Sequence, residues 1–289
     1  MQGQATRQLV TAGMRLWAVV RLLRPLNFVL FLAGVTLGGF LSGGEAAFEG
    51  LLGVRLFMAA LSAALIGGAA NSLNDVYDLE IDRINRPSRP LPSGLVGPRV
   101  AWGLWVLGTA AGVLLSVRLS AVHVVMALTS AALLFAYSAV LKRTLFTGNL
   151  VVALVVALAL VYGGWAVGPP GSSLVAAAFA FLTTLAREVV KDMEDSAGDA
   201  ALGARTLPVV RGPAAAVKVT TVLIGLTILL TPLPFLLLDY SGLFLLLVLL
   251  VDVLLIGVLW RLQSAQAGRA STLLKAAMVV GMAALALAG

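Results

Sequence analysis

The strongest constraint on the fold of this chain is a series of nine apolar stretches, each long enough to cross a lipid bilayer. They lie at about residues 26–42, 51–74, 99–117, 120–140, 149–168, 173–191, 213–236, 241–260 and 270–288. A membrane-spanning helix needs roughly 20 consecutive, mostly apolar residues. The chain is 60% hydrophobic and 11% charged, whereas a soluble domain carries roughly 25% charged residues. We therefore predict an all-α, polytopic membrane protein whose nine helices form one bundle.

The residues that are rare or missing exclude several kinds of site. The chain contains no cysteine, which excludes disulfides and thiolate metal ligands. It contains a single histidine, His123, which excludes zinc sites built from several histidines. We expect His123 to be structural and to lie near the outer face. The first residues are polar and basic, and no short apolar core with a small-residue cleavage site follows, so we expect no cleavable signal peptide.

The basic residues predict the orientation of the bundle. If the N-terminus lies inside, Arg55 and Arg118 fall in outer loops, and the other 18 of the 20 Lys and Arg residues fall at the inner face. Inner loops of membrane proteins are enriched in Lys and Arg. We therefore predict a multi-pass protein of the cell membrane with a cytoplasmic N-terminus and an outer C-terminus.

An acidic stretch at the end of the second span is the first candidate site. Asn71, Asp75, Asp78 and Asp82 are separated by four, three and four residues, which would place them on one stripe of a continuous helix. Carboxylates close to a helix C-terminus repel one another and the negative end of the helix dipole. Asp and Asn oxygens are hard ligands, so this pattern favours Mg²⁺.

The same spacing occurs at the end of the sixth span, in Glu188, Asp192, Asp195 and Asp199. The two stretches lie 117 residues apart (188 minus 71), and they contain 9 of the 13 acidic residues. This repetition suggests a single membrane domain, 1–289, that contains two four-helix units at about 20–145 and 146–260, plus a ninth helix. Both stretches are then expected at the cytoplasmic ends of helices that face each other.

Two facing carboxylate clusters are typical of a site that holds two Mg²⁺ ions and a diphosphate. Mg²⁺ takes one or two protein carboxylates and completes its shell with phosphate oxygens and water. We expect the metal ligands among the two acidic stretches and assign catalytic importance to Asp75, Asp192, Lys142 and Tyr137. The candidates for binding the diphosphate are Arg24, Asn27, Arg86, Arg89, Lys142, Arg143, Arg187 and Lys191.

Some of these candidates also have simpler explanations. The enrichment of inner loops in Lys and Arg would by itself place basic residues here, and Tyr137 could be an aromatic anchor at the membrane interface. Arg187 differs because it lies within an apolar helix, where an ionisable residue indicates a function. Asp252, midway along the eighth span, receives no role.

Four features together resemble the UbiA superfamily of intramembrane prenyltransferases: the motif Asn74-Asp75-x-x-Asp78-x-x-x-Asp82, the second motif from Asp192 to Asp199, the segment with Tyr137 and Lys142, and the nine predicted helices. The resemblance extends from Arg24-Pro-Leu-Asn27 to about Gly212. It implies transfer of an isoprenyl group from its diphosphate, with Mg²⁺, in a central cavity that opens sideways to lipid. It also implies that both acidic motifs hold metal and diphosphate.

Within the superfamily, residues 74–94 and 187–199 are most similar to the archaeal digeranylgeranylglyceryl phosphate synthase branch. That similarity implies a geranylgeranyl-type donor and geranylgeranylglyceryl phosphate as acceptor, in ether lipid biosynthesis. Chlorophyll synthase-like and homogentisate-type members share much of the first segment. An aromatic acceptor such as 4-hydroxybenzoate, in quinone biosynthesis, is therefore the alternative. No general base is assigned, although a cluster carboxylate is a candidate for an oxygen acceptor.

Other expectations concern cofactors, partners and unrelated functions. Mn²⁺ is expected to substitute for Mg²⁺, the partners are the two substrates and the bilayer, and no nucleic acid is expected. The sequence does not indicate an oligomeric state. A cation-coupled transporter is a remote alternative, because transporters bind ions near the bilayer midplane, whereas these acids lie at helix ends. The paired acids also argue against a purely structural membrane anchor.

Overall fold

The structure, a computed structural model, describes residues 13–201 and 203–287, and within them nine helices are long and apolar enough to span a membrane. These helices are α2 Pro25–Gly43, α3 Gly50–Tyr77, α5 Pro98–Val117, α6 Ala121–Ala139, α7 Thr147–Val167, α8 Gly171–Ala201, α10 Pro213–Leu230, α12 Gly242–Gln263 and α13 Ala267–Ala286. The prediction of nine helices in an all-α membrane protein is confirmed.

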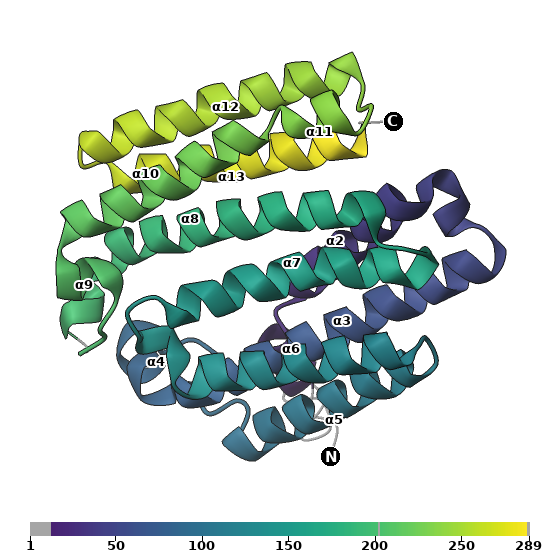
Figure 1. Cartoon of the computed structure of the whole chain (residues 1–289). Coiled ribbons are helices and arrows are strands. Elements are labelled where there is room, and N and C mark those ends of the chain that lie inside the picture. The colour runs from purple at the N-terminus through teal and green to yellow at the C-terminus, as the bar shows by residue number, and fades with distance from the viewer. Residues whose placement is uncertain (1–12, 202, 288–289) are drawn as a thin grey trace.

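The helices are arranged in a bundle whose middle is formed by α2, α7 and α8 (Figure 1). On one side of this middle layer lie α3, α5 and α6, and on the other side lie α10, α12 and α13. The largest helix interfaces join α3 to α5, α12 to α13, α2 to α7 and α7 to α8. Since α8 also packs against α10 and α13, it connects the two sides of the bundle.

Close approach of α2 and α7 depends on two glycines. A Cβ atom added at Gly38 would lie 2.0 Å from the carbonyl oxygen of Leu160, and one added at Gly163 would lie 1.8 Å from the carbonyl oxygen of Val35. Small residues allow membrane helices to bring their backbones into contact where hydrophobic burial provides little drive. Any larger residue at either position would push the two helices apart.

Short helices cover the end of the bundle that carries the acidic stretches. They are α4 Leu79–Asn85, the 3₁₀ helix η2 Leu141–Arg143 and α9 Leu207–Arg211. Figure 1 shows α4 and α9 at the same end of the bundle. At the opposite end lie the 3₁₀ helix η1 Gly44–Phe48 and the short helix α11 Leu233–Leu237.

Two helix boundaries differ from the sequence prediction. The first acidic stretch was expected on one continuous helix, but α3 ends at Tyr77, Asp78 forms its C-cap, and α4 begins at Leu79. That expectation is wrong beyond Asp75. In contrast, α8 continues to Ala201, ten residues beyond the expected end near residue 191. All four acids of the second stretch therefore lie on one helix, as predicted.

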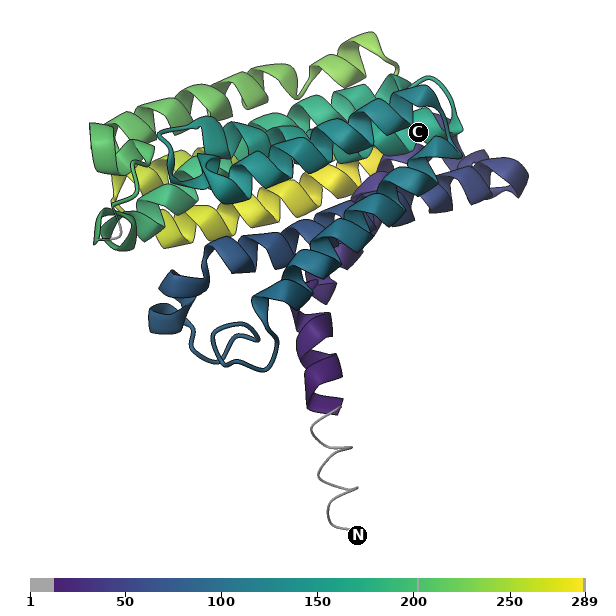
Figure 2. The ribbon, with the colours of Figure 1, turned by 90° about the horizontal axis from the view of Figure 1, so that it is seen from below.

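The first described segment, residues 13–22, is helical and runs across the direction of the spanning helices (Figure 2). Ala18 and Leu22 are buried against Leu91, Val96 and Ala101. Arg7, which contributes to the predicted orientation, lies outside the described residues. The cytoplasmic position of the N-terminus stays a prediction.

Candidate active site

Asp75 is the most buried carboxylate of the first acidic stretch, with 4% of its surface exposed. The Arg24 guanidinium donates to Asp75 from Nη2 to Oδ1 over 2.7 Å. Arg24 itself has φ 49°, a left-handed conformation that non-glycine residues rarely adopt. Such strained residues persist where the surrounding structure determines them, and they concentrate at functional sites. The strain at the start of α2 is therefore a second indication that Arg24 has a specific role.

Arg89 joins two carboxylates that lie on different helices. Its Nη1 donates to Oδ2 of Asp82 over 2.6 Å and lies 3.6 Å from Oδ1 of Asp75. Asp82 is buried in α4, and Arg89 reaches it from the following loop. Although the helix breaks at Asp78, this bridge keeps Asp75 and Asp82 close together.

Lys142 from η2 reaches the remaining carboxylate of this stretch. Its Nζ donates to Oδ1 of Asp78 over 2.5 Å and to Oδ1 of Asn74 over 3.3 Å. Asn74 Nδ2 donates to the other oxygen of Asp78 over 2.9 Å. Burial lowers the pKa of Lys142, while the charge and the hydrogen bond of Asp78 act in the opposite direction. The ammonium group is thus partly withdrawn from water and held by a carboxylate.

Asn71, on the last turns of α3, completes the first cluster. Asn27 Nδ2 donates to Oδ1 of Asn71 over 3.2 Å, and Asn71 Nδ2 donates to the Leu23 carbonyl over 3.4 Å. These bonds tie the start of α2 to α3. Arg24, Asn27 and Asn71, all predicted site residues, therefore lie in one connected network with Asp75.

The second acidic stretch is held mainly by neutral partners. Asn149 Nδ2 donates to Oδ2 of Asp192 over 2.7 Å, and the Thr206 hydroxyl donates to Oδ2 of Asp199 over 3.1 Å. Asp195 is exposed. Within the residues that the structure describes, Asp192, Asp195 and Asp199 take part in no ion pair with Lys or Arg.

Glu188 is the exception in the second stretch because it holds two cations. Its side chain is 8% exposed, with Arg187 Nη1 3.0 Å from Oε1 and Lys191 Nζ 3.5 Å from Oε2. Arg187, which the sequence placed within an apolar helix, therefore has a buried partner on the same helix. Most of the donor hydrogens of both cations remain available to a ligand.

Tyr137, near the end of α6, lies at the same end of the bundle as the two acidic stretches. It is followed by η2, whose Lys142 holds Asp78. A backbone hydrogen bond of 2.9 Å from Arg205 to Arg143 also joins the loop after α8 to η2. The two stretches thus border a common region.

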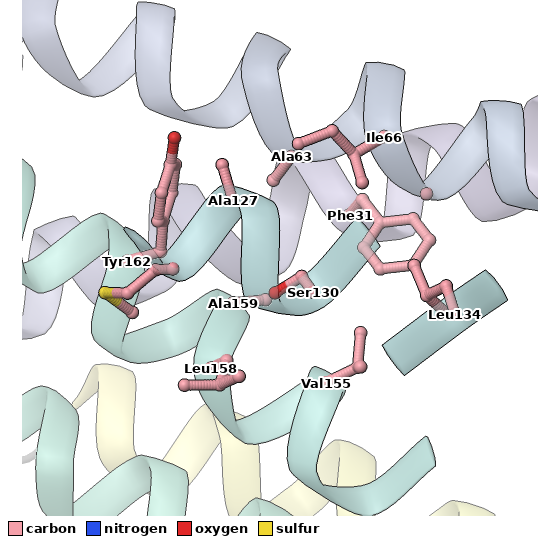
Figure 3. A pocket seen from close by; sticks show the side chains of 12 residues that line it. Phe31, Ala63, Ile66, Ala127, Ser130, Leu134, Val155, Leu158, Ala159 and Tyr162 are labelled. Atoms are coloured by element: carbon pink, nitrogen blue, oxygen red, sulfur yellow. The ribbon is translucent and has the colours of Figure 1, made fainter. Parts of the chain in front are cut away.

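An apolar pocket begins one helical turn from these polar groups, and Figure 3 shows the side chains that line it. It lies among α2, α3, α6 and α7 and contains about 390 Å³ of empty space, including its open side. Phe31, Gly67 and Leu134 line it, and they lie four, four and three residues from Asn27, Asn71 and Tyr137. The polar site and the apolar pocket are therefore neighbours along three helices.

The chemistry of these side chains fits Mg²⁺ bound together with a phosphate ligand. Among the described residues, no three Asp, Glu or His side chains come close enough to hold an ion by themselves. Mg²⁺ in proteins takes one or two carboxylates, with phosphate and water as the other ligands. The candidate donors are hard oxygens, and the carboxylates of the first stretch already attract cations.

Some predicted residues lie apart from this network, and others were missed. Arg86 and Arg143 are exposed, and no hydrogen bond of their side chains to the acids is present among the described residues. Asn149 and Thr206 were not among the predicted site residues, and Asn74 was named only as part of the first motif, although these three residues hold Asp192, Asp199 and Asp78. Asn149 could have been found as a polar residue at the start of an otherwise apolar span.

The fold and the site define a membrane enzyme that handles a charged group beside an apolar pocket, and comparison with known proteins identifies the class. The model of the UbiA prenyltransferase family matches residues 29–282. The chain belongs to this family and is a membrane prenyltransferase. This assignment sets aside the transporter and anchor alternatives.

Curated relatives and solved structures make the similarity more specific. Digeranylgeranylglyceryl phosphate synthase of Methanopyrus kandleri is 36% identical over 268 residues, which cover 92% of this chain and 96% of the relative. The enzyme of the same name from Metallosphaera sedula is 40% identical over 271 residues, covering 89% and 94%.

Among solved structures, one described as digeranylgeranylglyceryl phosphate synthase in membranes has a TM-score of 0.85 at 27% identity, and it covers 95% of this chain and 98% of that one. A UbiA homologue from Archaeoglobus fulgidus bound to GPP and Mg²⁺ has a TM-score of 0.70 at 21% identity, covering 93% and 99%. At 21% identity, the similarity to the Archaeoglobus fulgidus structure shows a shared fold.

Proposed function

We propose that this protein transfers a geranylgeranyl-type group from its diphosphate to geranylgeranylglyceryl phosphate, a step of ether lipid synthesis. The observation that carries the proposal is the position of the apolar pocket, one helical turn from Asn71 and Asn27 in a network that includes Asp75. Such a site suits a ligand with a charged head and a long apolar tail. The names of the relatives with 36% and 40% identity support the acceptor.

The diphosphate is bound between the two acidic stretches together with Mg²⁺, and we infer two ions, for which Mn²⁺ can substitute. Asn71, Asp75 and Asp78 are the proposed ligands on one side, and Asp192 and Asp195 are those on the other. When bound, Mg²⁺ would neutralise charge on the diphosphate and so promote its departure. A UbiA homologue of the same fold has been solved with GPP and Mg²⁺, which supports this composition.

Arg24 and Lys142 supply fixed positive charge to the same region. They pair with Asp75 and Asp78 over 2.7 and 2.5 Å. A bound metal ion would compensate these carboxylates, and the two cations could then turn to the diphosphate oxygens. Charge that is placed in advance where the leaving group develops its own charge stabilises the transition state.

The apolar pocket holds the prenyl tail and keeps water from the reacting carbon. As the allylic C1–O bond breaks, the positive charge that develops on the prenyl group would react with any water present. An environment without water prevents this side reaction. Burial of each CH₂ of the tail contributes about 0.8 kcal/mol, so the membrane-embedded pocket also avoids exposing a long chain to water.

The acceptor hydroxyl forms the new C–O bond to the prenyl group and loses its proton. The base that we propose for this proton is a carboxylate of the two stretches that does not bind the metal ion. Asn149 holds one carboxylate oxygen of Asp192 at 2.7 Å, which leaves the other oxygen of Asp192 for the metal ion. Tyr137 is the residue of α6 that we assign to the reacting centre.

We also propose on which side of the membrane the site lies. The site lies at the cytoplasmic face of the cell membrane, because the basic loops of the predicted topology gather at this end. Both substrates are amphipathic lipids, so they reach the site along the bilayer. The tail then enters through the open side of the pocket.

The experiment is an assay of the purified protein with radiolabelled geranylgeranyl diphosphate and two acceptors, geranylgeranylglyceryl phosphate and 4-hydroxybenzoate. We expect a labelled lipid product with the first acceptor, loss of activity in excess chelator, and recovery on addition of Mg²⁺ or Mn²⁺. Product with 4-hydroxybenzoate alone would contradict the proposed acceptor. Full turnover in chelator would contradict the proposed metal requirement.

A further inference from the structure

The end of the apolar pocket that lies away from the acidic stretches is closed by a polar cluster inside the membrane. The pocket runs along the helices from Leu134 and Gly67, near the site, to Ala127 and Ala63, where Tyr162 lies (Figure 3). Tyr162 is 4% exposed. Polar side chains within a membrane are costly unless they are hydrogen-bonded, and they often mark functional positions.

Hydrogen bonds hold the Tyr162 side chain against α3. Ser62 on α3 donates to the Gly112 carbonyl over 2.7 Å, so its oxygen is free to accept from the Tyr162 hydroxyl, which lies 2.9 Å away. A serine hydroxyl has one hydrogen and two lone pairs, which fixes the direction of both bonds. Since Ser62 is fully buried, the phenol is anchored at one depth of the bundle.

His123 on α6 holds the backbone and the ring of the same tyrosine. Its Nε2 lies 3.3 Å from the Tyr162 carbonyl oxygen and donates to it, while Nδ1 accepts from the Ser120 hydroxyl at 2.8 Å. The imidazole packs edge-on against the phenol ring, with centroids 4.7 Å apart. Tyr162 therefore crosses from α7 to α3 with contacts to α6, and its ring forms a wall across the pocket.

The depth of this wall matches a donor with four isoprene units. From Asp75 to Ala63 there are 12 residues of α3 (75 minus 63), about 18 Å at 1.5 Å per residue. An extended geranylgeranyl chain is roughly 20 Å long by standard carbon–carbon geometry. We propose that Tyr162 is the stop that limits the length of the donor chain, and that Ser62 and His123 hold it in place. This inference rests on the proposed function.

The test measures kcat/KM for farnesyl, geranylgeranyl and geranylfarnesyl diphosphates in full-length variants. The substitution Tyr162→Ala removes the wall. We therefore expect the kcat/KM for geranylfarnesyl diphosphate, divided by that for geranylgeranyl diphosphate, to rise about 10-fold or more. Even one methylene changes selectivity by about 10-fold or more in an apolar pocket. Tyr162→Phe keeps the ring and should leave this ratio near that of the wild type.

A second variant makes the pocket shallower instead of deeper. Ala127→Leu fills the deep end of the pocket and should shift preference toward farnesyl diphosphate, whereas Ala132→Leu adds the same volume on an exposed part of α6 and should not. If Tyr162→Ala does not fold, Ala127→Leu alone decides. Unchanged chain-length ratios in folded Tyr162→Ala and Ala127→Leu overturn the inference.

Failure of the proposed function gives a different result. In that case the wild type transfers no prenyl group from any of the three donors to geranylgeranylglyceryl phosphate. Binding of the three labelled diphosphates to the same variants then takes the place of kcat/KM. A shift in relative affinity supports the stop, and equal relative affinities in all variants reject it.

Discussion

The two acidic stretches have the same spacing in the sequence, but the protein compensates their charge in different ways. In the first stretch, Asp75, Asp78 and Asp82 each pair with a cation that comes from a different segment. In the second, Asp192 and Asp199 accept hydrogen bonds from Asn149 and Thr206, which are neutral. The carboxylates of the first stretch are therefore balanced by Lys and Arg side chains, whereas in the second stretch only Glu188 has such partners among the described residues.

This difference suggests how the two sides share the binding of a metal diphosphate. Asp192 and Asp195 of α8, which pair with no Lys or Arg among the described residues, present the stronger attraction for a metal ion. On the other side, Asp75 and Asp78 would hold the metal ion, and Arg24 and Lys142, now paired with them, would then be available to the diphosphate. The first side would thus exchange one set of charges for another. On the second side, a metal ion would add positive charge beside Asp192 and Asp195, which pair with no Lys or Arg among the described residues.

The largest effect is expected from removing one carboxylate on each side. Asp75→Asn and Asp192→Asn keep the shape of the side chain and remove the charge that holds the metal ion. We expect each to lower kcat by roughly 1,000-fold, at the upper end of the range for loss of one electrostatic group in an active site. The measurement is turnover of labelled geranylgeranyl diphosphate by folded protein in detergent.

The matched control is Asp252→Asn. Asp252 is another carboxylate within a span, but its oxygens lie 3.0 and 3.1 Å from the Thr231 hydroxyl, away from both acidic stretches. Its replacement should leave turnover unchanged. Normal activity in either Asp75→Asn or Asp192→Asn would show that the metal model is wrong.

Lys142 tests whether a fixed cation on the first side is needed. Lys142→Gln leaves Asp78 without its ammonium partner and removes a charge proposed for the diphosphate, so we expect roughly a 100-fold loss of kcat/KM, in the range of one electrostatic group. Lys142→Arg keeps the charge and should recover part of that loss. Equal activity in the Gln and Arg variants would mean that charge at this position does not matter.

The helices and both acidic stretches could be predicted from the sequence, because apolar length and charge spacing are local properties. The end of α8 could not, since hydropathy indicates where a helix leaves the membrane and not where the helix stops. Likewise, the break after Tyr77 is a local backbone feature that the regular spacing of Asp75, Asp78 and Asp82 conceals.

The partners of the acids were less predictable, because they depend on how distant segments pack. Arg24 and Asp75 are 51 residues apart, and Asn149 and Asp192 are 43 apart. The sequence indicated that basic residues gather near the acids, but it could not say which of them make contact. The division into two four-helix units also stays a prediction.

A smaller effect is expected from the neutral partners of the second stretch. Asn149→Ala removes the donor that orients Asp192 and leaves the carboxylate itself in place. Groups that orient a metal ligand typically contribute 10- to 100-fold, so we expect a loss of about 10-fold, with a larger Mg²⁺ concentration needed for half-maximal activity. The Mg²⁺ dependence distinguishes this role from a purely structural one. An unchanged Mg²⁺ dependence in folded protein would contradict it.

The smallest effect is expected at Arg86, and its neighbour Arg89 provides the contrast. Both follow the first stretch and both were predicted to bind diphosphate, but Arg89 is bonded to buried Asp82 and lies near Asp75, whereas Arg86 is exposed. Arg89→Gln should leave Asp82 buried without its cation and lower both activity and thermal stability. Arg86→Gln should change neither by a measurable amount, because an exposed charge is screened and contributes about 0–1 kcal/mol. A loss of activity in Arg86→Gln as large as that in Arg89→Gln would mean that Arg86 also binds the diphosphate, and that its exposure does not distinguish it from Arg89.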